Sequence, residues 1–152
     1  MLKRTGLCPT RVIMEITEDA LLDHPDAARN MLVRLRALRV GAALDDFGTS
    51  YFSLHYLHAL PLRLLKIDRV FVEELDKGGR TNSTAVVAAI LALAQALNIQ
   101  VIAQGIGTQA QRIALASMGY QMGQGYLLGR PVSVEKDFCV DVSSPLLSAG
   151  RD

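Results

Sequence analysis

Residues 44–51, Leu44-Asp45-Asp46-Phe47-Gly48-Thr49-Ser50-Tyr51, decide the fold of this chain. The run before the two acids is apolar and consists of Val40, Ala42, Ala43 and Leu44. Such a continuous run is typical of a strand that is covered on both faces, as in a parallel sheet. Because two neighbouring carboxylates cannot stay inside that sheet, we expect Asp45 and Asp46 to lie at its rim.

Two adjacent carboxylates repel each other, so they need a cation, a basic partner or water to stay ionised. A bound metal ion is the simplest of these solutions. The alternative is structural: Asp46 would cap the turn that follows, and Asp45 would be solvated. These residues alone leave both interpretations open.

The composition describes one soluble globular domain. The chain has 152 residues, of which 50% are hydrophobic and 20% charged. This length is enough to bury a core. A formal net charge of +1 gives no electrostatic footprint for nucleic acid or for an anionic membrane. We therefore expect neither DNA, RNA nor a membrane as a partner.

The cysteines and the apolar stretches limit where in the cell this chain is expected. Cys8 and Cys139 are far apart and suggest neither a disulfide framework nor a metal knuckle, which fits a reduced cytoplasmic setting. The longest apolar stretch, residues 85–94, is well short of the roughly 20 residues that span a bilayer.

Strand and helix patterns alternate along the chain. The predicted strands cover residues 11–18, 40–46, 62–68, 99–103 and 120–127. The predicted helices start at Pro25, at about residue 84 and at Thr108. The second helix runs to about residue 97 and is so apolar that we expect it to be covered on most sides. Thr108 and Gln111 form a predicted capping box, and Gly119 ends that helix.

Polar side chains recur where the predicted strands end: Glu15, Asp45, Asp46, Lys66, Gln104 and Gln124. Parallel strands joined by crossover helices place all their carboxyl ends at one edge. The sequence therefore predicts an α/β fold, a partial TIM-like (β/α) barrel of about five mostly parallel strands with flanking helices. In such barrels the carboxyl edge carries the active site.

Four ordered motifs resemble the EAL domain family: residues 14–18, 44–51, 65–72, and 124–127 with Arg130-Pro131. The resemblance implies a β/α barrel that hydrolyses the bacterial second messenger cyclic di-GMP with Mg²⁺ or Mn²⁺. It covers nearly the whole chain. We expect residues 1–142 to form a truncated EAL-like domain and residues 143–152 a flexible C-terminal tail, with a short helix at about residues 133–140.

The resemblance also implies roles for individual residues. Glu15 would bind the first metal, Asp45 one or both metals, and Asp46 the second metal, where it would also take part in catalysis. Lys66 would orient the attacking water or a phosphate oxygen. Glu18 would anchor the loop after Asp46, and Gln124 would help to place the water or the ligand.

The chain departs from the family pattern at several places. Residues 103–108 read Ala-Gln-Gly-Ile-Gly-Thr where the family has Ala-Glu-Gly-Val-Glu-Thr, so Gln104 and Gly107 replace two acids. Ser50 stands in place of a loop glycine, and Phe52 in place of a small polar residue. The family's first strand, with its Glu-Ala-Leu signature, and a later asparagine ligand have no counterpart in this sequence.

Two functions are therefore considered. In the first, the chain is a degenerate EAL-like domain that serves cyclic di-GMP signalling as a non-catalytic binding or interaction module. In the second, it is a metal-dependent cyclic di-GMP phosphodiesterase, on its own or within a longer chain or assembly. The lost acids favour the first function, because metal sites fail when ligands are missing. We expect the chain alone to be inactive and Mg²⁺ or Mn²⁺ to bind weakly or not at all.

About five strands cannot close a barrel, so the sheet is expected to have two open edges. Its inner face, expected to include Val12, Met14, Ala43, Leu65 and Ile102, would meet water. A second copy of the chain is the simplest cover for such a surface. We therefore predict a homodimer or a higher homo-oligomer.

Overall fold

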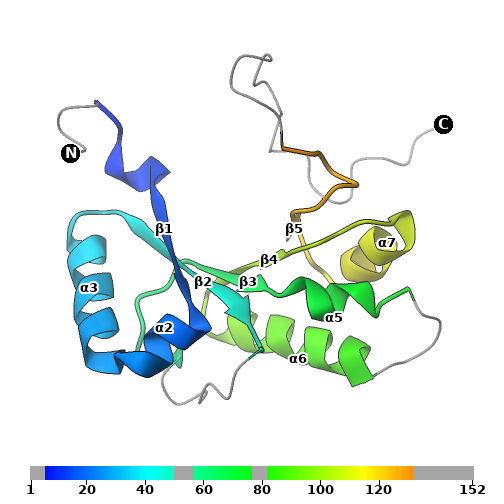
Figure 1. The fold of residues 1–152 in the computed structure, drawn as a ribbon, viewed down its shortest axis with the longest axis horizontal. Coiled ribbons are helices and arrows are strands. Elements are labelled where there is room, and N and C mark those ends of the chain that lie inside the picture. Colours follow the sequence, from blue (N-terminus) through cyan, green and yellow to red (C-terminus); the bar gives the residue numbers. More distant parts are fainter. Residues whose placement is uncertain (1–5, 50–56, 77–81, 132–152) are drawn as a thin grey trace.

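The computed structural model describes residues 6–49, 57–76 and 82–131. They contain one parallel five-stranded sheet in the sequential order β1-β2-β3-β4-β5 (Figure 1). The strands are β1 (Ile13–Thr17), β2 (Gly41–Phe47), β3 (Leu64–Ile67), β4 (Gln100–Ala103) and β5 (Met122–Gly123). The predicted α/β arrangement of about five parallel strands is confirmed.

The helices lie between consecutive strands. They are α2 (Glu18–Asp23), α3 (Pro25–Ala37), α5 (Arg69–Glu73), α6 (Asn82–Ala96) and α7 (Gln109–Ser117), after a short 3-10 turn η1 (Pro9–Arg11). The predicted capping box at the start of α7 is present, since the Thr108 hydroxyl accepts from the Gln111 N–H and the Gln111 side chain accepts from the Thr108 N–H. Gly119, with a φ of 94°, follows the end of this helix.

The core lies between one face of the sheet and the helices. Alternate residues of the strands, including Leu44, Leu65 and Val101, pack in one apolar cluster with Leu32 of α3 and Val87 of α6. Tyr120 is buried against α6 and donates a hydrogen bond of 2.9 Å to the carbonyl of Val87. Burial raises the pKa of this phenol.

The predicted inner face was partly wrong in register. Leu65 belongs to the core cluster on the helix side and is fully buried. Because strand side chains alternate between faces, the neighbouring Lys66 points to the other face, which is the face of Glu15, Ala43 and Asp45. Ala43 is also fully buried, flanked by Glu15 and Leu64 on the adjacent strands.

Two elements differ from prediction in extent. Helix α6 is not covered on most sides: Ala85, Val86, Ala88 and Ala89 are exposed, Val86 by 39%. The fifth strand has only two residues, because the chain turns after Gly123 and the Leu127 N–H donates to the carbonyl of Ile106.

Some predictions lie outside the described residues, namely the helix at about residues 133–140 and the tail 143–152. Within the described ranges, every helix falls short of the length and apolar character that a bilayer crossing requires.

Candidate functional site

The two adjacent acids lie where β2 departs from regular pairing. The register with β3 shifts between Leu44 and Phe47, and Asp46 has a φ of 55°. In a regular strand, neighbouring side chains would point to opposite faces. A bulge re-aims one of them, and such bulges often occur at the rims of barrels. The irregularity thus allows the side chains of both acids to lie at the carboxyl edge of the sheet.

Lys66 joins Glu15 and Asp45 across three strands. Its ammonium group lies 2.8 Å from the Glu15 carboxylate and 3.1 Å from that of Asp45. The Lys66 side chain is 7% exposed, while that of Glu15 is 51% exposed. Burial lowers the pKa of Lys66, but the hydrogen bonds that Lys66 donates to Glu15 and Asp45, together with the charges of these carboxylates, outweigh it, and the net pKa is raised. Lys66 is therefore a charged ammonium that neutralises the acids beside it.

Gln104 completes the environment of Asp45. Its side-chain Nε2 donates a hydrogen bond of 3.0 Å to Asp45 Oδ1, which also accepts from the backbone N–H of Asp46 at 3.1 Å. With Lys66, three donors surround this one carboxylate. The amide of Gln104 thus presents N–H to a position where a glutamate would present only acceptor oxygens.

Asp46 lies in a negative environment. Burial is the largest influence that raises the pKa of its carboxyl, followed by the charges of Asp45 and Asp68, against a smaller lowering by Lys66. Asp68 itself caps α5 by accepting from the N–H of Val70 at 2.8 Å. The ionised form of Asp46 is therefore disfavoured relative to a solvated aspartate.

Glu18 holds the turn after Asp46. The Glu18 residue is 2% exposed at the start of α2, and its Oε2 accepts from the N–H of Gly48 at 3.1 Å. Gly48 has a φ of 96°, and a Cβ atom there would meet the Phe71 ring at 2.8 Å. Glycine is thus required for both the backbone conformation and the close approach of α5.

A pocket of about 610 Å³, which we call the rim pocket, opens beside these residues at the carboxyl edge. It is lined by Asp46, Asp68, Arg69, Gln104 and Gln124, among others. Gln124 is positioned through its backbone: its N–H donates to the carbonyl of Ala103, and its own carbonyl accepts from Ile106. The pocket therefore combines carboxylates, side-chain amides and one guanidinium.

We tested whether the rim side chains fit a divalent cation. Among the described residues, no group of three or more His, Cys, Asp or Glu side chains is arranged to hold a metal ion. Magnesium and manganese prefer oxygen ligands. Here Lys66 lies between Glu15 and Asp45, and Gln104 turns an N–H toward Asp45. In this arrangement the donor set does not fit a metal.

The structure thus brings Glu15, Asp45, Lys66 and Gln104 into one hydrogen-bonded cluster, with Asp46 and Gln124 in the adjoining pocket and Glu18 on the supporting turn. Sequence reasoning did not single out Asp68, Arg69 or Tyr126, which also line the pocket. Asp68 follows directly after β3, so the rule that indicated the other strand ends could have found it. Arg69 and Tyr126 lie beyond their strands and carry no such signal.

The comparisons with known proteins agree on the family. The EAL domain pattern matches residues 1–131. The chain is 43% identical to the bifunctional diguanylate cyclase/cyclic di-GMP phosphodiesterase MucR of Pseudomonas aeruginosa over 89% of this chain and 19% of that protein. It is 39% identical to the cyclic di-GMP phosphodiesterase RocR of the same organism, over 91% of this chain and 36% of RocR. The chain thus spans a fraction of the length of these relatives.

Solved structures give the same result. The cyclic di-GMP complex of the PaMucR phosphodiesterase superimposes with a TM-score of 0.82 and 43% identity, over 88% of this chain and 53% of that one. A manganese and cyclic di-GMP complex of Klebsiella pneumoniae BlrP1 gives a TM-score of 0.79 and 32% identity, over 86% of this chain and 33% of that one. The matched sequence pattern, the identities and the shared fold lead to one conclusion: this chain belongs to the EAL domain family.

Proposed function

We propose that this chain serves cyclic di-GMP signalling as a non-catalytic module that binds the nucleotide in the rim pocket without hydrolysing it efficiently. The observation that carries the proposal is the hydrogen bond from Gln104 Nε2 to Asp45. A phosphodiester-cleaving metal centre needs acceptor oxygens around its cations. An amide donor directed at the central carboxylate opposes that arrangement.

The pocket has groups suited to a phosphodiester ligand. Arg69 lines it and can donate to phosphate oxygens, while the side chains of Gln104 and Gln124 supply further donors. Arg69 pairs only loosely with Glu73, at 3.9 Å and with both side chains more than half exposed, so this pair can be exchanged for a ligand at little cost. Lys66 would set the orientation of Asp45 rather than activate water.

Hydrolysis is the second candidate function. It is favoured by the retained cluster of Glu15, Asp45 and Lys66 and by the phosphodiesterase names of similar proteins. In that case Mg²⁺ or Mn²⁺ would have to displace Lys66 from the space between the two carboxylates. Calorimetry with cyclic di-GMP, with and without Mn²⁺, combined with detection of the linear product, separates the two functions. Multiple turnover by the unmodified chain would contradict the proposal, as would absence of nucleotide binding.

A single substitution tests the role of the amide. Gln104→Glu replaces the donor by a carboxylate about 3 Å from Asp45. We expect Mn²⁺ affinity, measured by calorimetry, to rise by about tenfold or more, because two carboxylates then share a cation instead of repelling each other. We do not expect turnover to appear, because Gly107 still lacks the second acid of the family pattern.

The matched control is Gln124→Glu, which adds the same charge to the same pocket and leaves the hydrogen bond between Gln104 and Asp45 in place. An equal gain in Mn²⁺ affinity from both variants would show that general negative charge, not the position of Gln104, controls metal binding. Robust turnover by Gln104→Glu would refute the expectation about Gly107.

A further inference from the structure

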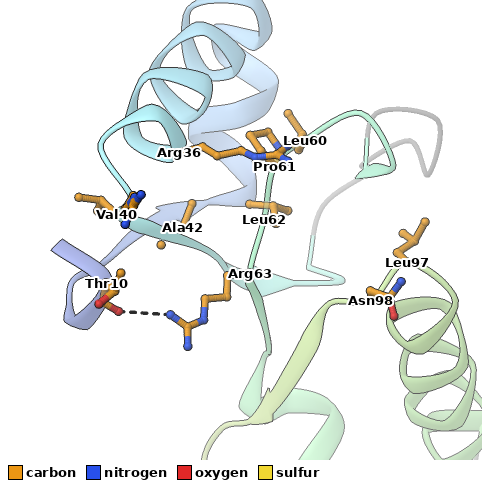
Figure 2. A pocket seen from close by; sticks show the side chains of 12 residues that line it. Thr10, Arg36, Val40, Ala42, Leu60, Pro61, Leu62, Arg63, Leu97 and Asn98 are labelled. Atoms are coloured by element: carbon orange, nitrogen blue, oxygen red, sulfur yellow. Dashed lines mark hydrogen bonds between the residues drawn. The ribbon is translucent and has the colours of Figure 1, made fainter.

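A second hollow lies at the amino ends of the strands, on the opposite edge of the sheet from the rim pocket. It has a volume of about 510 Å³, and Figure 2 shows its lining side chains, among them Arg36 and Arg63 beside the apolar Leu60, Pro61 and Leu62. Arg39 also lines it. Ala42 and Asp46 of β2 line the two hollows and are four residues apart, so the hollows are separated by roughly 13 Å at about 3.3 Å per residue.

The hollow continues into a neighbouring one. A further hollow of about 570 Å³ shares Arg36, Leu60 and Pro61 with the first and adds Arg29 and His58. We call the two together the basal groove. No aspartate or glutamate is among the described residues that line it. The groove therefore extends over two adjoining hollows and is lined by basic and apolar residues.

The arginines of the basal groove keep their charge available. Arg63 donates a hydrogen bond of 3.3 Å to the backbone carbonyl of Thr10, which leaves its positive charge unbalanced. Within the described part of the chain, ion pairs involve Lys66 and Arg69, and none involves Arg36, Arg39 or Arg63. A neutral hydrogen bond positions a guanidinium without neutralising it, so an anion can still bind.

Arg39 is held in a conformation that arginine rarely adopts. It follows the end of α3 with a φ of 61°, while the N–H of Val40 donates back to the carbonyl of Leu35. Glycine is the residue most often found at this position, and asparagine is the next most common. Asn98, with a φ of 55°, occupies the equivalent place after α6 and lines the same hollow. An arginine kept in strained backbone indicates that its side chain is used.

Stabilisation of helix ends accounts for only part of this pattern. Cations in the last turn of a helix complement its dipole, and this explains Arg36 of α3. Arg39 lies beyond that helix, and Arg63 lies directly before β3. These arginines come from separate elements and line one hollow. Helix-end stabilisation therefore does not explain Arg39 and Arg63.

The chemistry of the groove selects the kind of ligand. Apart from the imidazole of His58, no aromatic ring is among its described lining residues, so the groove offers little stacking surface for nucleobases. The formal net charge of +1 gives no broad field for nucleic acid. The same low net charge gives no broad field for an anionic membrane. The guanidinium groups of the groove share its lining with the apolar Leu60, Pro61 and Leu62.

We propose that the basal groove binds an acidic polypeptide segment of a partner protein, with carboxylates at Arg36, Arg39 and Arg63 and apolar side chains against residues 60–62. This interaction goes beyond the proposed nucleotide-binding function and is independent of it. It would connect the EAL domain to a partner from the edge of the sheet that is remote from the nucleotide.

The test uses a fluorescein-labelled peptide of alternating glutamates and leucines, with fluorescence anisotropy as the readout. We expect saturable binding to the full chain that weakens as salt is raised, and no comparable binding of the same peptide with lysines in place of glutamates. Arg39→Gly should weaken binding by about tenfold, since it removes one charge-assisted contact. It should not impair folding, because glycine is favoured at this backbone conformation.

Asn98→Gly is the matched control, because it makes the same backbone change at the same hollow without removing a charge. It should bind the peptide as the unmodified chain does, and Arg39→Gly should bind cyclic di-GMP unchanged in calorimetry. Equal peptide binding by both variants would overturn the proposal. So would equal binding of the lysine peptide, or tighter binding of a single-stranded oligonucleotide or of anionic phosphatidylserine vesicles.

Discussion

Asp46 combines an unfavourable charge with an unusual backbone conformation. Burial and the nearby charges of Asp45 and Asp68 raise the pKa of its carboxyl, and its φ of 55° lies in the left-handed region. Asparagine adopts this region readily. Asp46→Asn should therefore increase the free energy of unfolding at pH 7 by about 0.5 kcal/mol, by removing like-charge repulsion. Urea denaturation measures this directly.

The pH dependence has a definite sign. Because the pKa of Asp46 is raised in the folded chain, the folded state binds this proton more tightly, and the unmodified chain gains relative stability as pH falls. The extra stability of Asp46→Asn over the unmodified chain should thus be fully present at pH 7. It should disappear as the pH falls through the raised pKa. A variant less stable than the unmodified chain at pH 7 would contradict the argument.

Asp45→Asn provides the contrasting measurement at the adjacent position. It deprives the buried Lys66 of one anionic partner, and it disturbs the hydrogen bonds from Gln104 and Asp46. This variant should lose about 1–3 kcal/mol of stability. Opposite signs for two neighbouring aspartates would show that Asp45 stabilises the rim and that Asp46 does not.

At the scale of elements, local patterns predicted strands and helices well where one pattern decided the structure. The apolar run before Asp45 became a strand, and Thr108 with Gln111 became a capping box. The fifth strand failed because its length depends on a non-local contact. Gly125 packs directly on the backbone of Ile106, and this contact turns the chain away from β4. No periodicity in residues 120–127 encodes it.

This contact makes Gly125 the most sensitive position of the β5 region. A Cβ atom added there would overlap with the backbone nitrogen and carbonyl of Ile106, which is itself fully buried. Backbone atoms cannot rotate away as a side chain can. Gly125→Ala should therefore separate the two segments and lose about 3 kcal/mol or more of stability. Thermal unfolding followed by circular dichroism measures the loss.

Gly129→Ala is the matched control, because a Cβ atom at that position meets nothing within 4 Å. It should leave stability within about 0.5 kcal/mol of the unmodified chain. Gly125→Ala should also weaken cyclic di-GMP binding, because Gln124 is positioned by the same pair of segments. Equal melting temperatures for the two variants would show that the backbone near Ile106 can move to accommodate the added Cβ atom without loss of stability.

At the scale of the whole molecule, the edge at which the polar side chains come together followed from topology. Polar residues at successive strand ends predicted a site at the carboxyl edge, and parallel strands did bring Glu15, Asp45 and Lys66 together. The sequence could not show that Gln104 donates to Asp45, since this depends on the geometry of three strands. The basal groove was missed for a related reason: its arginines come from separate segments and share no motif.

The open sheet leads to the last prediction, which concerns assembly. Strands β1 and β5 form the two edges of the described sheet, and β5 has only two residues, so β1 is the edge with more unpaired backbone groups. Ile13 and Met14 on this edge are 39% and 50% exposed. Each Å² of apolar surface left in water costs about 25 cal/mol, and an unpaired strand edge invites pairing. A two-fold axis would satisfy both copies with a single patch.

We therefore expect a homodimer at micromolar concentration by light scattering. The double variant Ile13→Lys with Met14→Lys should be monomeric, whereas Ile113→Lys, at a more exposed apolar position on α7, should remain dimeric. A stable, cooperatively unfolding monomer of the unmodified chain would refute this prediction and would mean that the β1 edge is covered from within the chain.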